Sequence, residues 1–310
     1  MNELGVTIII PTYNAEKYIE RCLNSLINQT YKKKEIILVD NYSGDKTIEI
    51  AKKFKVKIIF NKIKNAKISK KIGLNQSKGD LIYFGDSDVI IEDKNWLSAM
   101  VEPFVKEKNI FASECKWGIA KDFSITNRYC ALLGIADPVA RMISQRKPNK
   151  IEKKGNYDLY YYKNGQNPVL YCVLWKKELI EYANKDYRDF NEGRTPTNLI
   201  YFGYNKVAHI KISEAHHYYA ENFTEFIKKR SKTALRHLKR EKEENSTWIK
   251  NSGSLKLYLS IIYCFSIIFP FFESIKNILK DKHISWIIHS PMCFVTLSVY
   301  YYNFLKDKVL

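Results

Sequence analysis

The feature that most constrains this chain is the alternation of short apolar runs and helix-like segments through residues 6–106. The apolar runs, which we expect to form strands, lie at residues 6–10, 35–39, 56–60 and 81–84. Segments with helical spacing of apolar residues follow each of them, at residues 14–29, 46–53, 66–78 and 96–106. Strands that are apolar along their whole length are typical of a parallel sheet covered by helices on both faces. The alternation therefore predicts an α/β fold with a mostly parallel, Rossmann-like sheet flanked by helices.

Acidic residues stand directly after two of the predicted strands. Asp40 ends the second apolar run, and Asp86 and Asp88 follow the fourth. Ligands of such sheets bind beyond the carboxyl ends of the strands. Two carboxylates one residue apart can offer oxygen ligands to Mg²⁺ or Mn²⁺, and the ion can bind a diphosphate. An isolated D-x-D motif is more often a solvated turn, but a further acid at the same edge favours a nucleotide-diphosphate site.

The last part of the chain differs in composition. Residues 257–272 and 284–305 contain no charged side chain. Crossing a bilayer takes about 20 apolar residues. The second segment is long enough, although His289, Ser290 and Pro291 interrupt it, and the first is short. We expect two membrane-associated α-helices, and the alternatives of a spanning hairpin, interfacial helices and buried core helices stay open.

The chain carries a large positive charge. With 51 Lys and Arg residues against 33 Asp and Glu residues, the formal net charge is +18. Such a balance indicates a nucleic acid, an anionic membrane surface or a phosphorylated substrate as partner. Eight of the basic residues lie between positions 228 and 242, in a predicted amphipathic helix at residues 223–244. Because apolar segments follow this helix and no base-reading module is present, we favour an anionic lipid surface and exclude nucleic acid.

Cysteine usage and the N-terminus indicate the compartment. The six cysteines are scattered without a C-x-x-C pair, which disfavours a structural zinc site and favours reduced thiols in a cytosolic setting. The first apolar run stops at Pro11 and has neither a basic region before it nor a cleavage site, so no signal peptide is predicted. We expect the protein at the cytoplasmic face of the cell membrane, attached through its C-terminal helices.

Several motifs of the first hundred residues occur together in a fixed order. They are VTIIIPTYNAEKYI at 6–19, NQTY at 28–31, EIILVDNYSGDKT at 35–47 and SKGDLIYFGDSDV at 77–89. In this order the motifs closely resemble the start of glycosyltransferase family 2. The resemblance covers residues 5–105, thins beyond them and revives at residues 214–230. It implies an inverting, nucleotide-sugar-dependent glycosyltransferase of hexosyltransferase type with the GT-A fold.

The resemblance implies roles for individual residues in binding the nucleotide sugar. The matching positions are Thr12, Tyr13, Glu16, Asp40, Lys70 and Asp86. Asp40 corresponds to the acid that contacts the base or ribose, and Asp86 to an acid beside the diphosphate. Lys70 and Lys71 stand where the family commonly has an Arg-Asn pair, and their ammonium groups can still face a diphosphate. The implied donor is a UDP- or GDP-sugar.

A divalent metal, Mn²⁺ or Mg²⁺, is the cofactor that the resemblance implies. Asp88 matches the direct carboxylate ligand of the D-x-D motif. His217 matches a late histidine that completes metal or phosphate contacts, and its neighbour His216 remains an alternative because either neutral imidazole can bind a metal.

The general base is the least defined part of the predicted site. Inverting transfer is a single displacement, so one carboxylate near the sugar suffices to deprotonate the acceptor hydroxyl. Asp189 and Glu192 are the candidates, but an arginine stands about where the family's second acid is expected. Tyr171 and Trp175 also make the expected acceptor wall bulkier. These departures leave an alternative function, a catalytically degenerate GT-A-like subunit that serves binding or assembly at a membrane.

The sequence thus predicts three parts. They are a GT-A catalytic domain at 1–222, a basic amphipathic helix and linker at 223–254, and two hydrophobic membrane-associated helices at 255–310. We expect the enzyme to extend a polyprenyl-linked or cell-surface glycan acceptor.

Overall fold

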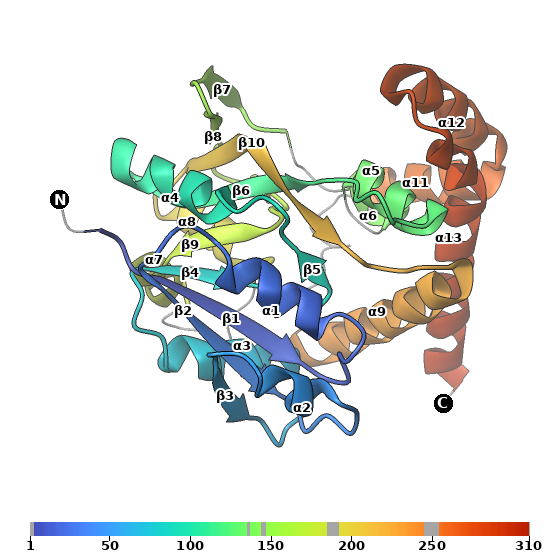
Figure 1. Cartoon of the computed structure of the whole chain (residues 1–310). Coiled ribbons are helices and arrows are strands. Elements are labelled where there is room, and N and C mark those ends of the chain that lie inside the picture. The colour runs from blue at the N-terminus through green and yellow to red at the C-terminus, as the bar shows by residue number, and fades with distance from the viewer. Residues whose placement is uncertain (1–2, 135–136, 144–146, 185–191, 245–253, 310) are drawn as a thin grey trace. The chain divides into compact units, whose positions relative to one another are not determined.

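The computed structural model describes residues 3–134, 137–143, 147–184, 192–244 and 254–309 (Figure 1). Contacts divide the chain into two compact units. The sheet unit comprises Met1–Trp117 and Gln145–His217, and the helical unit comprises Gly118–Ser144 and Tyr218–Leu310. Residues 118–144 therefore belong to the same unit as the C-terminal helices. The predicted division, with boundaries after residues 222 and 254, assigns them to the catalytic domain instead. Those predicted domain boundaries stay a prediction.

The sheet unit is built on one mixed sheet. Its strands run in the spatial order β3-β2-β1-β4-β9-β6-β10-β8-β7, and β5 pairs with β10. Their bounds are β1 (Val6–Thr12), β2 (Lys34–Asp40), β3 (Lys57–Phe60), β4 (Leu81–Phe84), β5 (Val89–Ile90), β6 (Ile110–Trp117), β7 (Lys150–Lys153), β8 (Tyr157–Tyr161), β9 (Val173–Lys176) and β10 (Lys206–His217). The four strands β1 to β4 are mutually parallel, whereas β9 runs antiparallel to both β4 and β6. The predicted α/β fold is confirmed.

Helices cover both faces of this sheet, which explains why its central strands are apolar at every position. The helices of the unit are α1 (Ile19–Ile27), α2 (Thr47–Ala51), α3 (Ala66–Asn75), α4 (Trp96–Lys106), α7 (Lys177–Ala183) and α8 (Thr195–Tyr201). Ile8 and Ile10 belong to the core formed with α1 and α4, whereas Ile9 points to the opposite face and the core formed with α3, α7 and α8. Alternate side chains of a strand point to opposite faces, so a doubly covered strand needs apolar residues throughout.

The first strand is longer than predicted, and the helix after it is shorter. β1 continues through Pro11 to Thr12 because β2 pairs with its whole length, whereas β4 pairs only with residues 6–9. The missing N–H of Pro11 lies on the β4 side, beyond the end of that strand, and so costs no ladder hydrogen bond. The predicted helix at 14–29 begins only at Ile19, since Asn14 has a positive φ of 49° in the preceding loop.

The helical unit contains more helices than the sequence indicates. Its elements are α5 (Ile125–Leu133), α6 (Pro138–Ile143), α9 (Phe223–Glu244), α11 (Ser254–Ser266), α12 (Ile268–Asp281), the 3-10 helix η1 (Ile284–Ile288) and α13 (His289–Val309). Where two apolar helices were expected, three α-helices and η1 are present. Tyr129, Phe226, Trp286 and Met292 form much of the core.

The predicted basic helix at 223–244 is confirmed as α9, but its charges do not all face solvent. Arg230 is only 6% exposed and donates a hydrogen bond of 3.0 Å to Asp137. Tyr300 of α13 donates to the same carboxylate. Lys228, Lys232 and Arg236, in contrast, are exposed at intervals of four residues and share one face of α9. Of the basic run, Arg230 therefore holds the helical unit together and does not face a polyanion.

No helix in the described ranges has, by itself, the length and apolar content needed to cross a bilayer. The segments Tyr258–Ser266 and Ile268–Asp281 meet that requirement only as a pair, and they are bent against each other by 79°.

Close packing of α3 on β1 generates the first prediction. A Cβ at Gly73 would lie 2.3 Å from Cγ2 of the fully buried Ile9. Overpacking costs about 1–3 kcal/mol, and an approach of 2.3 Å puts this site in the upper part of that range, whereas the better helix propensity of alanine returns about 1 kcal/mol. We expect Gly73→Ala to lower the free energy of unfolding in urea by about 1–2 kcal/mol. Gly155→Ala is the control, because nothing lies within 4 Å of its Cβ; equal stability of the two variants would contradict this packing.

Candidate active site

The carboxyl ends of β1, β2 and β4 define one edge of the sheet. Thr12 is in register with Asp40, and Ile9 with Phe84, so residues that follow these strands lie at the same edge. The sequence-predicted residues Thr12, Tyr13, Asp40, Asp86 and Asp88 are all at or beyond these strand ends. The structure thus brings them together, as the positions of the acids suggest.

Asp40 is completely buried and accepts three hydrogen bonds. Thr12 Oγ1 donates to it at 3.0 Å, and the backbone N–H and hydroxyl of Ser43 donate at 2.8 and 2.6 Å. A carboxylate has about four lone-pair sites, so capacity for one further donor remains. These contacts fix the loop that follows β2 against the end of β1.

A buried amide network, which the sequence analysis missed, continues this edge. Asn41 donates to the Thr12 carbonyl at 3.0 Å and accepts from both Asn61 and Ser69 at 3.0 Å. Asn61 follows β3 and is buried like Asn41. The network therefore joins β1, β2, β3 and the first turn of α3. Asn61 directly follows the predicted strand at 56–60, and Asn41 comes one residue after Asp40 at the end of the strand at 35–39; these two positions were the signal that could have revealed it.

Two further residues implied to bind nucleotide occupy the loop after β1. Tyr13 is exposed, and the Lys64 ammonium lies 5.3 Å from the centre of its ring. Glu16 instead accepts a hydrogen bond from the Lys46 backbone N–H at 3.0 Å, and its own N–H donates to Asp45. Tyr13 thus has an exposed ring with a lysine over it, whereas Glu16 links its loop to the start of α2.

Lys70 brings α3 and the segment before α8 together at the site. Its buried ammonium lies 2.7 Å from Glu192 Oε1. Burial opposes the charged form most strongly, yet attraction to Glu192 and Asp86 raises the pKa of Lys70 above its ordinary value. The ammonium is therefore charged at neutral pH and faces two carboxylates. Glu192 thus lies at the site, whereas the other base candidate, Asp189, lies outside the described residues.

Asp88 meets His217 across 129 positions of the sequence. The two-residue strand β5 follows Asp88 and pairs antiparallel with the end of β10, which sets Val89 opposite His217. Asp88 Oδ1 lies 3.3 Å from His217 Nε2, and both side chains are partly exposed. His216 lies near Glu92 and Glu214 instead, at 3.8 and 3.5 Å. Of the two histidines, His217 is therefore the one beside the D-x-D motif.

An aromatic wall adjoins this pair. The ring centres of His217 and Trp117 are 5.0 Å apart, and those of Trp117 and Tyr171 are 6.3 Å apart. The expectation that Trp175 forms part of the wall is wrong, because Trp175 is buried in the core and stacks on Phe111 at 6.2 Å. Tyr171 lies before β9, and Cys172 between them has a positive φ of 47°, so the regular alternation of the strand does not extend to Tyr171.

Asp88 and His217 suit a metal ion whose remaining ligands come from the substrate and water. Within the described ranges, no group of three or more His, Cys, Asp or Glu side chains is arranged to hold an ion. Mg²⁺-type sites use one or two carboxylates and complete their shell with phosphates and water. Two adjacent ligands of an octahedral ion with bonds of about 2.1 Å lie about 3.0 Å apart, close to the Asp88–His217 separation. One carboxylate and one imidazole therefore fit such an ion.

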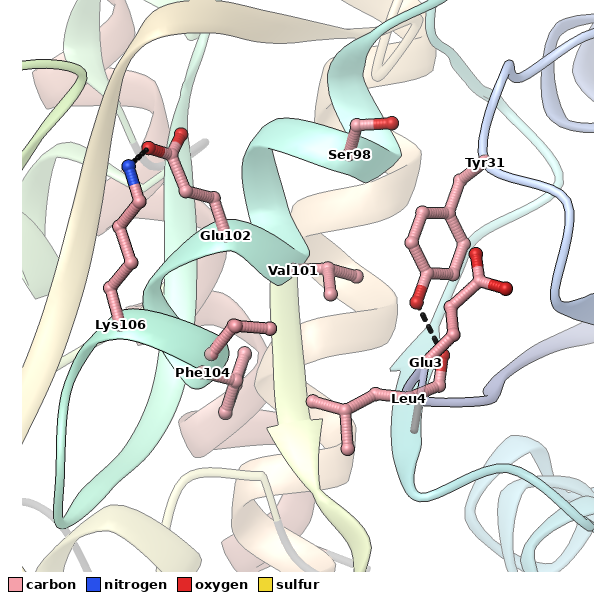
Figure 2. A pocket seen from close by; sticks show the side chains of 9 residues that line it. Glu3, Leu4, Tyr31, Ser98, Val101, Glu102, Phe104 and Lys106 are labelled. Carbon is pink, nitrogen blue, oxygen red and sulfur yellow. Dashed lines mark hydrogen bonds and ion pairs between the residues drawn. The ribbon is translucent and has the colours of Figure 1, made fainter. Parts of the chain in front are cut away.

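A cavity of about 640 Å³ lies elsewhere in the sheet unit (Figure 2). Leu4 and Tyr31, which precede β1 and β2, line it together with α4. Tyr31 donates a hydrogen bond to the Leu4 carbonyl, and Lys106 pairs with Glu102 at the rim. This cavity is at the amino edge of the parallel strands, so it is separate from the candidate active site.

The mixed sheet with helices on both faces is the architecture of GT-A glycosyltransferases. Residues 7–171, more than half of the chain, match the model of Glycosyl transferase family 2. The chain belongs to glycosyltransferase family 2.

Two relatives of about 40% identity each match less than a third of the chain. Glycosyltransferase GlyA of Streptococcus pneumoniae is 41% identical over 92 residues, which are 28% of this chain and 13% of that protein. An uncharacterized glycosyltransferase of Haemophilus influenzae is 40% identical over 97 residues, 29% of this chain and 39% of that protein. The chain thus spans less than two thirds of either relative.

Two matches extend over nearly the whole chain. A Methanococcus voltae protein is 27% identical over 326 residues, covering 98% of this chain and 97% of its own length; it is a dolichyl N-acetyl-α-D-glucosaminyl phosphate 3-β-D-2,3-diacetamido-2,3-dideoxy-β-D-glucuronosyltransferase. The structure of the mannosyltransferase PcManGT from Pyrobaculum calidifontis covers 99% of this chain and 88% of its own, with a TM-score of 0.61 and 13% identity. At that identity the likeness shows the fold.

The amide network generates the second prediction. Asn41→Leu removes the acceptor of Asn61 and Ser69 and leaves the buried Asn61 amide with fewer partners. An unsatisfied buried group costs about 1–3 kcal/mol, so we expect a loss of unfolding free energy of that size. Asn164→Leu, at an exposed turn, is the control and should change stability by less than about 0.5 kcal/mol. Urea unfolding of both variants measures the difference, and a loss no larger than the control's would show that the network stabilises nothing.

Proposed function

We propose that this chain is an inverting, metal-dependent glycosyltransferase. It moves a sugar from a nucleotide-diphosphate donor to a polyprenyl-linked or cell-surface glycan acceptor at the cytoplasmic face of a membrane. The observation that carries the proposal is the convergence of Asp86, Asp88, His217, Lys70 and Glu192 at one sheet edge. These groups suit a diphosphate leaving group beside an acceptor hydroxyl.

The donor would bind along the strand ends. The exposed ring of Tyr13 can stack on a nucleobase. Asp40 is completely buried, so its contact with the base or ribose would require the Ser43 loop to move and one of the present hydrogen bonds to be exchanged. The choice of a UDP- or GDP-sugar follows the family, and PcManGT was solved in complex with GDP-Man and Mn²⁺.

The diphosphate would lie between Lys70 and the Asp88–His217 pair. A divalent ion held by Asp88 and His217 would supply charge neutralisation to the diphosphate. Lys70 is buried and charged, so it donates to a phosphate oxygen without first losing a full hydration shell. Negative charge grows on the leaving diphosphate as the glycosidic bond breaks, and a fixed cation there stabilises the transition state more than the ground state.

Glu192 is the described candidate for the base. One of its oxygens contacts Lys70, and its side chain is half exposed. When phosphate oxygens compete for the Lys70 ammonium, the carboxylate is released to accept the acceptor's proton. Attack from the face opposite the leaving group then inverts the anomeric centre. Asp189 keeps its place as the alternative base.

The acceptor class rests on a relative and on composition. The full-length Methanococcus voltae relative acts on a dolichyl-phosphate-linked sugar. The exposed Lys228, Lys232 and Arg236 of α9 suit an anionic membrane surface. The competing function is a catalytically degenerate binding subunit. If the Lys70–Glu192 ion pair stays intact when the donor is bound, Glu192 cannot act as the base, and this function is favoured.

The metal role generates the third prediction. We expect Asp88→Ala to lower nucleoside-diphosphate release about 100-fold or more, because a ligand of the ion is lost. His217→Ala should act in the same direction and raise the Mn²⁺ concentration needed for half-maximal rate. The assay uses UDP- and GDP-sugars, Mn²⁺ and membrane lipids. Asp158→Asn, whose carboxylate pairs with Lys211 away from this edge, is the control; activity of Asp88→Ala equal to that control would refute the metal role.

The Lys70–Glu192 pair generates the fourth prediction. Glu192→Gln should lower kcat about 10²–10⁴-fold with little change in donor affinity, as expected for a general base. Lys70→Met should instead weaken binding of the nucleoside diphosphate about tenfold or more, because charged hydrogen bonds contribute about 1.5–3 kcal/mol. Lys78→Met is the control, because Lys78 is exposed and precedes β4, at the opposite edge of the sheet. Unchanged kcat in Glu192→Gln would leave Asp189 as the base, and donor binding without turnover in the wild type would favour the binding subunit.

A further inference from the structure

The helices α11 and α12 have their polarity reversed relative to the helices of a water-soluble domain. The positions of α12 that are buried in the helical unit are Pro270, Ser274 and Asn277. Those of α11 include Ser260 and Cys264. Large apolar side chains lie on the outside instead: Tyr258, Leu259, Ile262, Phe265, Ile267, Ile268, Phe269, Phe271, Phe272, Ile275 and Leu279 are all exposed.

The sheet unit shows the ordinary arrangement and so serves as an internal comparison. Its helix α1 buries Ile19, Cys22, Leu23 and Leu26. More than half of the exposed large apolar side chains of the described chain fall between residues 258 and 305. Monomeric soluble proteins rarely expose apolar patches of this extent, and such patches mark an interaction surface.

The polar interior of these helices is satisfied from within. Ser274 donates to the Pro270 carbonyl, Thr296 to that of Met292, and Ser290 to that of Ile267. His289 bonds Tyr129 at 2.8 Å and Tyr263 at 3.1 Å. Small and hydrogen-bonded polar residues between helices, with apolar residues outside, are the pattern of helices that pack in lipid.

The geometry restricts how such a surface can meet a bilayer. At 1.5 Å per residue, α11 and α12 are each about 20 Å long, shorter than the hydrocarbon core of about 30 Å. They meet at a bend of 79° beside Ile267, which has a φ of 59°. The bend is the most apolar part, since residues 267–269 and 271–272 are all exposed and apolar. The far end of α12 carries exposed Lys276, Lys280 and Lys282.

We propose that the α11–α12 elbow, residues 258–279, inserts into one leaflet of a lipid bilayer from one side without crossing it. The apolar bend enters the acyl region, and the lysines at the end of α12 stay at the level of anionic headgroups, where each contributes electrostatic attraction. The insertion specifies how the protein would attach to the membrane named in the proposed function, and its biological purpose rests on that proposed function. It does not depend on sugar transfer.

A fluid lipid phase fits the elbow better than a second copy of the chain. Five of the six residues at 267–272 are exposed and apolar. Consecutive residues of a helix point about 100° apart, so these side chains surround the bend. A flat protein interface would contact one face of it and leave the rest in water, whereas acyl chains contact every side.

Vesicle flotation of the full-length protein tests this surface. Ile268→Ser/Phe272→Ser changes two side chains that are 62% and 63% exposed. Ile212→Ser/Phe202→Ser is the matched control in the sheet unit, where the same residue types are 57% and 46% exposed. We expect the elbow variant to bind vesicles of phosphatidylcholine mixed with phosphatidylglycerol at least about tenfold more weakly than wild type, and the control to bind like wild type. Binding to phosphatidylcholine alone should persist at high salt, since the apolar contribution is not screened.

Three results would overturn the inference. They are equal flotation of the elbow variant and the control, no flotation of the wild type, and a wild-type dimer that becomes monomeric only in the elbow variant, which would assign the surface to a second copy. Folding of the elbow variant is checked by its nucleoside-diphosphate affinity, which should equal that of wild type. Asp88→Ala should float like wild type, so a failure of sugar transfer and a failure of membrane insertion are distinguishable.

Discussion

The candidate active site depends on the pairing of β5 with the end of β10. This ladder is only two residues long, with Val89 opposite His217 and Ile90 opposite His216. It follows the D-x-D motif directly, so the position of Asp88 is set by the strand that carries the histidines. Because alternate residues of a strand face opposite sides, the register also decides which histidine meets Asp88. A shift by one residue would present His216 and bury His217.

A second constraint acts at the other side of the same edge. Asn41 and Asn61 are buried amides that bond each other and Ser69, and Ser69 precedes Lys70 in α3. Fixing the first turn of α3 fixes the direction of the Lys70 side chain. The lysine is then held in a buried position by its attraction to Glu192 and Asp86. Preorganisation of this kind places positive charge where a leaving diphosphate needs it, before the substrate arrives.

The sequence was sufficient for the central strands and for the acids that follow them, because both signals are local. A doubly covered strand must be apolar throughout, and an acid after it must lie at the carboxyl edge. The contacts between Lys70 and Glu192 and between Asp88 and His217 join residues more than a hundred positions apart. Only the order of the strands in the sheet brings them together. The family resemblance supplied the residues of both pairs, but neither their distances nor the choice of Glu192 as the carboxylate that meets Lys70.

The helical unit shows a different limit of sequence patterns. A run of apolar residues without charge indicates that a segment is removed from water. It does not indicate whether the large apolar side chains face the protein core or an apolar phase outside it. In α12 the residues that pack inward are Pro270, Ser274 and Asn277, which no hydrophobic pattern would select as a core. The same sequence would be frustrated in water, since its large side chains gain nothing by exposure. The arrangement is favourable when the helix is surrounded by lipid. The phenylalanines then contact acyl chains, and the serine and asparagine pack against neighbouring helices. The bend at Ile267 lies inside the uncharged run at 257–272 and divides it between α11 and α12, so one apolar run in the sequence need not form one straight helix.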